Sequence, residues 1–377
     1  MEKQDKEDKV DRVENHILKR FQLQKKIGQG AYGVVFKAID RKTKETVALK
    51  KLFGAFRDAT DSQRTFREVM LLQELNGHNN IIRLLNVIKA QNNLDLYLIF
   101  DYMEADVFNV IRAGILQDIH KQYIIYQTLK ALKFIHSADI IHRDLKPSNI
   151  FINSDSRVKL GDFGLARTLS SGPSSYGMIV TEYVATRWYR APEMLLKSVN
   201  YGKPIDMWSV GCILYELLVG RPLFPGKSTR DMITLVFEVT GLPDEEEYEA
   251  VRQECEIPIL YNELKSQLGK IRKQKNLNSL IGNYCKDPNA IDLMTKLLQF
   301  NPKNRLTAEE ALEHPFVAKF HDPKEEIVCD RKIRIPLDDT KKFTLNIYRQ
   351  KLYDIVMQRK MEIRKHIMES IKKKQQG

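Results

Sequence analysis

The chain lacks the features that mark secreted, metal-clustered and membrane proteins. Its four cysteines, Cys212, Cys255, Cys285 and Cys329, lie far apart, and none forms a C-x-x-C pair. Neither a zinc site nor a disulfide framework is therefore indicated, and a reducing compartment fits. No apolar run approaches the roughly 20 residues that cross a bilayer, and the polar start M-E-K-Q-D-K-E-D-K contains no signal core. We expect a cytoplasmic or nuclear protein without a transmembrane segment.

The chain also lacks an even distribution of its positive charge. Its formal net charge is +12, but residues 341–377 hold eleven Lys or Arg residues against three acids, a net +8. Most of the excess therefore belongs to the tail, and we expect no nucleic-acid partner.

With 377 residues, the chain is long enough for two packed lobes. Strand-like patterns occupy residues 21–27, 34–40, 46–52, 81–89 and 94–100. Residues 61–75 have helical spacing, and an aspartate is expected to cap the start of that helix. After residue 103 the patterns become mainly helical, over 118–136, 205–219 and 289–299, and T-A-E-E-A-L at Thr307 predicts a capping box. A short helix is predicted before residue 20, carrying Val10, Val13 and Ile17.

Several motifs of phosphate-transfer chemistry occur in one order. G-Q-G-A-Y-G-V-V starts at Gly28, V-A-L-K ends at Lys50, H-R-D-L-K-P-S-N starts at His142, D-F-G at Asp162 and A-P-E at Ala191. A lone G-x-G-x-x-G is weak, because it recurs by chance in many folds. The set in this order is the protein-kinase signature.

The chain therefore resembles the eukaryotic protein kinases, over residues 21–320. T-E-Y at Thr181–Tyr183, inside V-T-E-Y-V-A-T-R-W-Y-R-A-P-E, resembles the mitogen-activated kinases of the ERK group. Phe100 and A-F-R-D-A-T-D-S-Q-R-T-F-R-E at 55–68 look like the atypical seventh-and-eighth ERK branch, whose members phosphorylate their own T-E-Y.

The resemblance implies an α+β, bilobal kinase fold with a small β-rich N-lobe carrying one main helix and a larger, mostly helical C-lobe. The expected divisions are an N-terminal extension at 1–20, the N-lobe at 21–102, the C-lobe at 103–320 and a C-terminal extension at 321–377. The C-lobe would contain the activation segment at 162–193 and an insertion at about 243–285.

For catalysis, the resemblance implies Asp144 as the base that accepts the substrate hydroxyl proton and Lys146 as the cation that stabilises the transferring phosphate. Lys50 would bind the α- and β-phosphates, oriented by Glu68. The resemblance further implies packing roles for His142 and Phe163, a buried ion pair between Glu193 and Arg305, and Asp206 bracing the catalytic loop.

ATP and Mg²⁺ are the implied cofactors. Mg²⁺ takes only a few oxygen ligands from a protein, and Asn149 and Asp162 would supply them. Phe100 would lie behind the adenine as gatekeeper. The other expected nucleotide contacts are Gly28, Gly30, Gly33 and Val35, the backbones of Asp101 and Met103, and Asp106 near the ribose.

The activation switch is expected at Thr181 and Tyr183, because phosphates between D-F-G and A-P-E order a loop through arginines. The expected partners of phospho-Thr181 are Arg67, Arg143 and Arg167, and those of phospho-Tyr183 are Arg187 and Arg190.

The leading hypothesis is a proline-directed Ser/Thr kinase of the mitogen-activated type, activated by autophosphorylation. The alternatives are a conventional ERK activated by an upstream kinase, a cyclin-dependent-like kinase, which T-E-Y argues against, and a catalytically dead scaffold. A scaffold would require loss of Lys50, Asp144, Asn149 or Asp162, and all four are present.

The expected partners are protein substrates with Ser/Thr-Pro sites and docking-motif proteins, and we expect a monomer. Docking should be weak, because basic residues dilute the acids of segment 321–334: Asp322, Glu325, Glu326 and Asp330 alternate with Lys324, Arg331, Lys332 and Arg334. The tail is predicted to form a basic amphipathic helix that packs an apolar face on the kinase and shows its lysines to solvent. Its stripe is Leu345, Tyr348, Leu352, Ile355, Ile363, Ile367 and Ile371.

Overall fold

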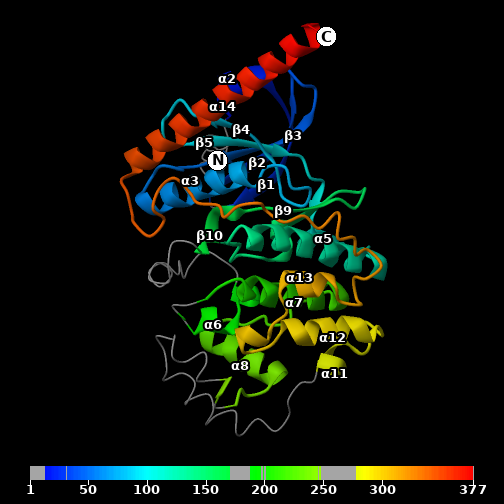
Figure 1. Cartoon of the computed structure of the whole chain (residues 1–377). Coiled ribbons are helices and arrows are strands. Elements are labelled where there is room, and N and C mark those ends of the chain that lie inside the picture. Colours follow the sequence, from blue (N-terminus) through cyan, green and yellow to red (C-terminus); the bar gives the residue numbers. More distant parts are fainter. Residues whose placement is uncertain are drawn as a thin grey trace, which may run out of the picture. The chain divides into compact units, whose positions relative to one another are not determined.

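The computed structural model describes residues 13–30, 32–169, 187–196, 198, 201–244, 246–247 and 277–376 (Figure 1). The chain forms two compact units. The first comprises Met1–Asn76, Ile82–Tyr102 and Lys341–Gly377, and the second comprises Gly77–Ile81 and Met103–Thr340. In the described part of the chain, no helix has the length and apolar character needed to span a membrane.

The first unit contains a five-stranded antiparallel sheet in the order β1-β2-β3-β5-β4. The strands are β1 (Phe21–Gly30), β2 (Gly33–Asp40), β3 (Thr46–Leu52), β4 (Leu84–Lys89) and β5 (Leu96–Asp101). All five predicted strands are confirmed. β4 begins three residues later than predicted, because Ile81 belongs to the second unit and forms an isolated bridge with Leu160.

The predicted N-terminal helix is α2 (Asn15–Arg20). Val13 and Ile17 are buried in a core cluster with Phe21, Tyr97 and other apolar residues of the sheet. Val10 lies outside the described residues. Val13 and Ile17, which precede β1, therefore belong to this unit's core.

The main helix of the first unit is α3 (Ala59–Glu74). The sequence placed its start at Asp61, but the cap is Asp58, whose Oδ1 accepts hydrogen bonds from the N–H groups of Thr60 and Asp61. Either aspartate satisfies the sequence rule for a helix start, so only the backbone geometry distinguishes them.

The predicted tail helix is α14 (Leu345–Gln376), and it packs along α3. Tyr348, Leu352 and Val356 are buried. The Tyr348 ring centroid lies 5.8 Å from that of Phe66 on α3. The first half of α14 thus has the predicted apolar contact with the rest of the chain.

Two details of the tail prediction are wrong. Ile363 is 53% exposed, so the buried stripe ends before it; the side chains of Ile367 and Ile371 lie outside the description. Lys360 does not point to solvent, since its Nζ donates to the Val87 carbonyl at 2.9 Å. Burial, with Arg20 and Arg364 nearby, lowers the pKa of Lys360.

The second unit is mainly helical, as predicted. Its helices are α4 (Val107–Ala113), α5 (Asp118–Ser137), α6 (Pro192–Leu195), α7 (Pro204–Val219), α8 (Thr229–Thr240), α11 (Leu277–Ile281), α12 (Pro288–Leu297) and α13 (Ala308–Leu312). Short 3₁₀ turns occur at η1 (Pro147–Asn149), η2 (Phe163–Leu165), η5 (Arg187–Tyr189) and η6 (Pro302–Asn304). The predicted capping box is present, with Thr307 and Glu310 bonded reciprocally.

Two small sheets and one central helix position the catalytic segment of this unit. The strands are β6 (Ala105–Asp106), β7 (Ile140–Ile141), β8 (Ile150–Ile152), β9 (Val158–Leu160) and β10 (Arg167–Thr168). Their orders are β6-β8-β9 and β10-β7. Helix α7 is buried over nearly its whole circumference, including Cys212, because its sequence is apolar on all sides. It packs beneath residues 142–149, the H-R-D-L-K-P-S-N segment that is called the catalytic loop below.

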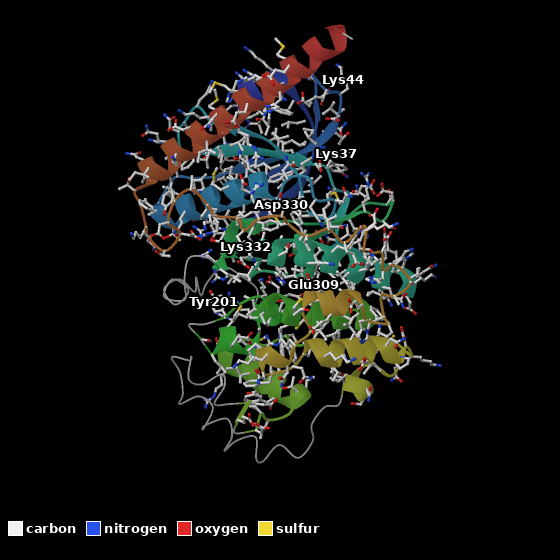
Figure 2. All side chains as sticks on the ribbon, in the orientation of Figure 1. Lys37, Lys44, Tyr201, Glu309, Asp330 and Lys332 are labelled. Atoms are coloured by element: carbon white, nitrogen blue, oxygen red, sulfur yellow. The ribbon has the colours of Figure 1, made fainter. Side chains whose placement is uncertain are left out.

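Residues 321–340, called the strap below, come after α13 in the second unit and pack against the residues between α5 and β7. The Ile333 N–H donates to the Ala138 carbonyl at 3.1 Å, and the Ile333 side chain is buried. Lys332 binds Asp139 at 2.9 Å (Figure 2 labels Asp330 and Lys332). The strap is therefore held by backbone and side-chain contacts.

Candidate active site

Asp144 lies at the centre of a compact polar cluster in the second unit. Its Oδ2 accepts from Lys146 Nζ at 2.8 Å and from Asn149 Nδ2 at 3.1 Å, and Asn149 Nδ2 also donates to the Asp144 carbonyl at 2.8 Å. The proline at the start of η1 fixes the turn that returns Asn149 to Asp144. A carboxylate, an ammonium and an amide thus meet within one short loop.

Asp206 on α7 holds this loop from below. Its side chain is fully buried and accepts from the N–H groups of His142 (2.8 Å) and Arg143 (2.9 Å) and from His136 Nε2 (2.9 Å). Burial raises the pKa of Asp206. The hydrogen bond from His136, the charges of His136 and His142 and the hydrogen bond from the His142 N–H together lower it by more, so the pKa of Asp206 lies below its ordinary value. The predicted brace is confirmed. It matters because Arg143 has φ +68°, a conformation that few non-glycine residues adopt.

Asp162 follows the loop in space, since the Gly161 N–H donates to the Asn149 carbonyl at 2.9 Å. Asp162 itself has φ +57°. His142 Nε2 donates to the Gly161 carbonyl at 2.9 Å, and the His142 ring packs edge-on against Phe163 with 5.0 Å between the ring centroids. The predicted packing role of these two rings is confirmed.

The donor set fits a hard cation with few protein ligands. Asn149 uses its amide nitrogen on Asp144, so its Oδ1 is the oxygen that could serve as a metal ligand, together with the carboxylate of Asp162. Among the described residues, no group of three or more His, Cys, Asp or Glu side chains could hold a metal ion.

In the first unit, the sheet register aligns three predicted residues. Gly28 on β1 lies opposite Val35 on β2, and Val35 lies opposite Lys50 on β3. Lys50 Nζ lies 3.0 Å from Glu68 Oε1 on α3, and Glu68 is buried. The lysine and glutamate that the sequence paired are therefore in contact.

The glycines of the β1–β2 hairpin serve two purposes. A Cβ at Gly33 would lie 2.2 Å from the Lys51 carbonyl oxygen, so close backbone packing requires glycine there. A Cβ at Gly30 would meet nothing within 4 Å. The protein's own packing thus does not explain Gly30, and the open space beside it fits a bound phosphate group.

The predicted adenine and ribose contacts are spread over both units. Phe100 is buried on β5 in the first unit, and the Asp101 N–H donates to the Arg83 carbonyl at 3.2 Å. Met103 and Asp106 belong to the second unit. Asp106 caps α4, where its two oxygens accept from Asn109 at 2.8 and 2.7 Å.

The structure brings two of the predicted phosphate-binding arginines together. Arg143 and Arg167 both donate to the Leu165 carbonyl, at 3.2 and 3.3 Å. Arg67 is buried on α3 in the first unit; in the second unit Arg187 is the first residue of η5, and Arg190 directly follows η5. Thr181 and Tyr183 lie outside the described residues.

Asp339 of the strap was missed by the sequence analysis. Its Oδ2 lies 3.6 Å from Arg167 Nε. No local motif signals a contact between residues so distant in sequence, and only the path of the strap reveals it.

The predicted ion pair of Glu193 and Arg305 is confirmed. Arg305 binds Glu193 through two bonds of 2.6 and 2.8 Å and also donates to the carbonyls of Gln299, Pro204 and Phe300. Both side chains are buried, so the pair ties α6 to the turn before α13.

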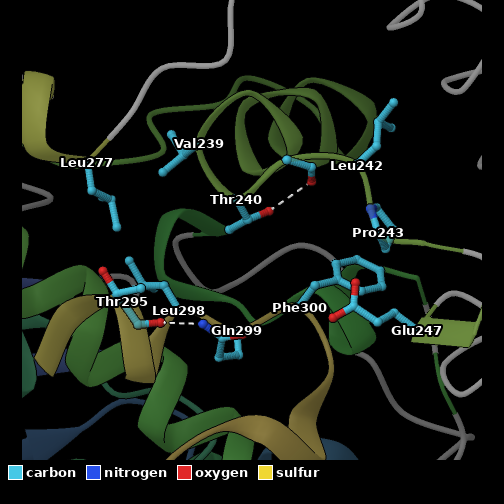
Figure 3. A pocket seen from close by; sticks show the side chains of 11 residues that line it. Val239, Thr240, Leu242, Pro243, Glu247, Leu277, Thr295, Leu298, Gln299 and Phe300 are labelled. Carbon is cyan, nitrogen blue, oxygen red and sulfur yellow. Dashed lines mark hydrogen bonds between the residues drawn. The ribbon is translucent and has the colours of Figure 1, made fainter. Parts of the chain in front are cut away.

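A cavity of about 510 Å³ lies elsewhere in the second unit, between the end of α8 and α12 (Figure 3). Leu277, Leu298 and Phe300 contribute to its lining. None of the predicted site residues lines it, so its size carries no information about the chemistry.

Comparison with known proteins gives consistent matches. A description of the protein kinase domain matches residues 21–317. "Extracellular signal-regulated kinase 2" of Dictyostelium discoideum is 54% identical over 356 residues, covering 94% of each chain. "Mitogen-activated protein kinase 15" of Xenopus laevis is 51% identical over 362 residues, covering 96% of this chain and 61% of that protein. "Extracellular signal-regulated kinase 7" of Drosophila melanogaster is 46% identical over 356 residues, covering 93% and 38%. The chain thus spans less than two thirds of the last two relatives.

Proposed function

Because the chain belongs to the protein kinases, as a mitogen-activated Ser/Thr protein kinase of the branch containing mitogen-activated protein kinase 15 and extracellular signal-regulated kinase 7, we propose that it is proline-directed and phosphorylates its own Thr181 and Tyr183. Membership implies use of ATP and action on protein substrates. The observation that carries the proposal is the intact cluster of Asp144, Lys146 and Asn149.

In the proposed chemistry, the substrate hydroxyl oxygen attacks the γ-phosphorus of ATP, Asp144 accepts the hydroxyl proton, and ADP leaves. Lys146 beside Asp144 would stabilise charge on the transferring phosphoryl group. Lys50, held by Glu68, would bind the α- and β-phosphates. Asn149 and Asp162 would hold Mg²⁺, which when bound neutralises phosphate charge.

The nucleotide contacts are proposed as the sequence predicted them, with Asp106 reaching the ribose from its position at the start of α4. The glycines at 28, 30 and 33 and Val35 would cover the phosphates and adenine, and Phe100 would close the back of the adenine site. The lobe and extension boundaries at residues 20, 102 and 320, with activation segment 162–193 and insertion 243–285, remain proposals as well.

Self-phosphorylation is supported by the state of the acidic residues that would recruit an upstream kinase. Glu326 is buried; its Oε1 lies 2.8 Å from His321 and 3.2 Å from the Asp322 N–H, and its Oε2 lies 3.7 Å from Lys133. Glu325 lies 3.7 Å from Lys130. Acids already paired within the protein attract basic docking peptides less strongly.

The test expresses the wild type and Asp144→Asn in a bacterial host without upstream activators, with mass spectrometry before and after addition of Mg-ATP. We expect phosphate on Thr181 and Tyr183 of the wild type and none on the variant. A wild type that stays unphosphorylated but gains activity from an added upstream kinase would favour a conventional ERK instead. A chain that Mg-ATP fails to stabilise thermally would favour a scaffold.

Proline direction is proposed because phospho-Tyr183, held by Arg187 and Arg190, would shape the pocket for the residue after the phosphoacceptor. Proline has no N–H and leaves no donor unsatisfied there. A peptide library should show a strong preference for proline at the following position, and equal use of all residues would contradict the proposal.

A further inference from the structure

A carboxylate of the strap contacts one of the arginines proposed to bind phospho-Thr181. Asp339 Oδ2 lies 3.6 Å from Arg167 Nε, and the two side chains are 4% and 13% exposed. Both residues belong to the second unit. Because a carboxylate with so little solvent access needs a nearby cation or donors, the contact is part of the fold and not a loose surface pairing.

The strap is fixed shortly before Asp339. The Cys329 N–H donates to Ser137 Oγ at 2.8 Å, Lys332 Nζ donates to the Ser137 carbonyl at 3.1 Å and to Asp139 at 2.9 Å, and the Ile333 N–H donates to Ala138. These contacts lie at the end of α5 and just before β7, the strand that pairs with Arg167 and Thr168 of β10. This part of the strap therefore lies against the segment that leads into β7, the strand paired with the one that carries Arg167.

Arg167 is one of two guanidinium groups that converge on the turn after D-F-G. Arg167 Nη1 donates to the carbonyls of Leu165 and Ala166, at 3.3 and 2.9 Å, and Arg143 Nη1 donates to Leu165 at 3.2 Å. Arg143 directly precedes Asp144 in the catalytic loop. An anion at Arg167 thus acts on a cluster that touches both the loop and the D-F-G turn.

We propose that Asp339 is a built-in stand-in for the phosphate of Thr181: it holds Arg167 in place in the unphosphorylated chain and yields that arginine to the phosphate after modification. This proposal rests on the proposed function, because the role of Thr181 is itself proposed there. Asp339 is a positioning residue, since it would act through Arg167.

The exchange follows from the chemistry of the two anions. A phosphothreonine carries a charge of about −1.5 to −2 and three strong acceptor oxygens, whereas a carboxylate carries one charge and two oxygens. Arginine binds both geometries well, so the phosphate displaces the weaker carboxylate. The stand-in gives the unmodified chain the activity that a first self-phosphorylation requires.

The test measures kcat and KM for ATP on a generic basic protein, in two forms of the full chain. In the Thr181→Ala background, which cannot carry the phosphate, Asp339→Asn should lower kcat about tenfold or more with little change in KM. In chains phosphorylated by tagged wild-type enzyme and verified by mass spectrometry, Asp339→Asn should leave kcat within about twofold. An equal loss in both forms, no loss in the Thr181→Ala form, or a gain of activity in it would each overturn the proposal.

Three further variants guard against a purely structural effect. Asp338→Asn makes the same charge change at an exposed neighbour that accepts from Thr340, and should be silent. Asp339→Glu keeps the carboxylate and should restore activity. In an Arg167→Gln, Thr181→Ala background, Asp339→Asn should cause no added loss, because the residue through which it acts is gone.

Failure of the proposed function is separable from failure of this inference. A wild type that never gains phosphate on Thr181 contradicts self-phosphorylation. The Thr181→Ala comparison needs no phosphate and still decides whether Asp339 positions Arg167.

Discussion

Asp206→Asn is the substitution for which the structure predicts the largest combined effect on the catalytic loop. Asp206 is a fully buried acceptor of three hydrogen bonds, two of them from the backbone N–H groups of His142 and Arg143. An asparagine offers one acceptor oxygen and one donor nitrogen. If the nitrogen replaces Oδ1, the Arg143 N–H loses its acceptor, and if it replaces Oδ2, the His142 N–H does.

The magnitude follows from that geometry. One buried N–H without an acceptor costs about 1–3 kcal/mol, and the remaining bonds lose the assistance of the charge, each such bond being worth about 1.5–3 kcal/mol. We expect a destabilisation of about 3–5 kcal/mol, in the range for breaking a buried charged network. We also expect kcat to fall at least about tenfold, or 1.4 kcal/mol, because the loop that carries Arg143 at positive φ beside Asp144 then loses one of its two backbone hydrogen bonds to residue 206.

The assay is urea unfolding followed by tryptophan fluorescence, with kcat measured on the folded protein. Both tryptophans, Trp188 and Trp208, lie in the second unit, so the signal reports on the unit that contains Asp206. The matched control is Asp292→Asn, whose carboxylate binds Lys296 and His314 but is 52% exposed, and which should cost less than about 1 kcal/mol. A variant at Asp206 within 1 kcal/mol of wild type and with unchanged kcat would refute the reasoning.

The effect of Asp206 should also depend on pH. The pKa of Asp206 in the folded chain is lowered, so its ionised form contributes stability above the ordinary aspartate pKa, and that contribution is lost as pH falls through the folded value. The difference between wild type and Asp206→Asn should therefore shrink as the pH falls below about 4. A difference that grows on acidification would contradict the sign.

Three further predictions concern the active site and the packing of each unit. Asp162→Asn should nearly abolish phosphoryl transfer while circular dichroism and thermal stability stay close to wild type; near-full kcat would contradict its role as a metal ligand. Glu193→Gln should cost about 3–5 kcal/mol in urea unfolding, because Arg305 is left buried with an incomplete partner, and a cost below about 1 kcal/mol would mean that solvent reaches Arg305. Leu352→Ala should destabilise the first unit by about 2–5 kcal/mol, read as lost hydrogen-exchange protection in α3, whereas Met357→Ala, exposed on the same helix, should change it little.

The sequence predicted the parts of the fold and site that depend on local pattern. The strands around Lys50 and the capping box at Thr307 each follow from neighbouring residues. The ion pair of Glu193 and Arg305 was predictable through the family resemblance alone, since no periodicity connects those segments.

The errors arose where two local rules were equally satisfied or where distant segments meet. Asp58 and Asp61 both suit a helix cap, and the backbone decides between them. The apolar spacing of α14 continues through Ile363, but burial against the rest of the unit ends before that residue, because Ile363 is exposed. The contact between Asp339 and Arg167 depends on the path of the strap, which hydrophobic patterning does not encode.

The composition of the first unit has a consequence for how the protein is made. This unit combines residues 1–76 and 82–102 with residues 341–377, and α14 covers α3 through Tyr348 and Leu352. During synthesis, α3 and its sheet leave the ribosome long before the helix that completes their core. At about 5–20 residues per second, the roughly 240 intervening residues take about 12–48 s. During that time the apolar surface of the nascent N-terminal segment stays exposed, so we expect chaperones to bind it. The mainly helical unit can reach its native packing first.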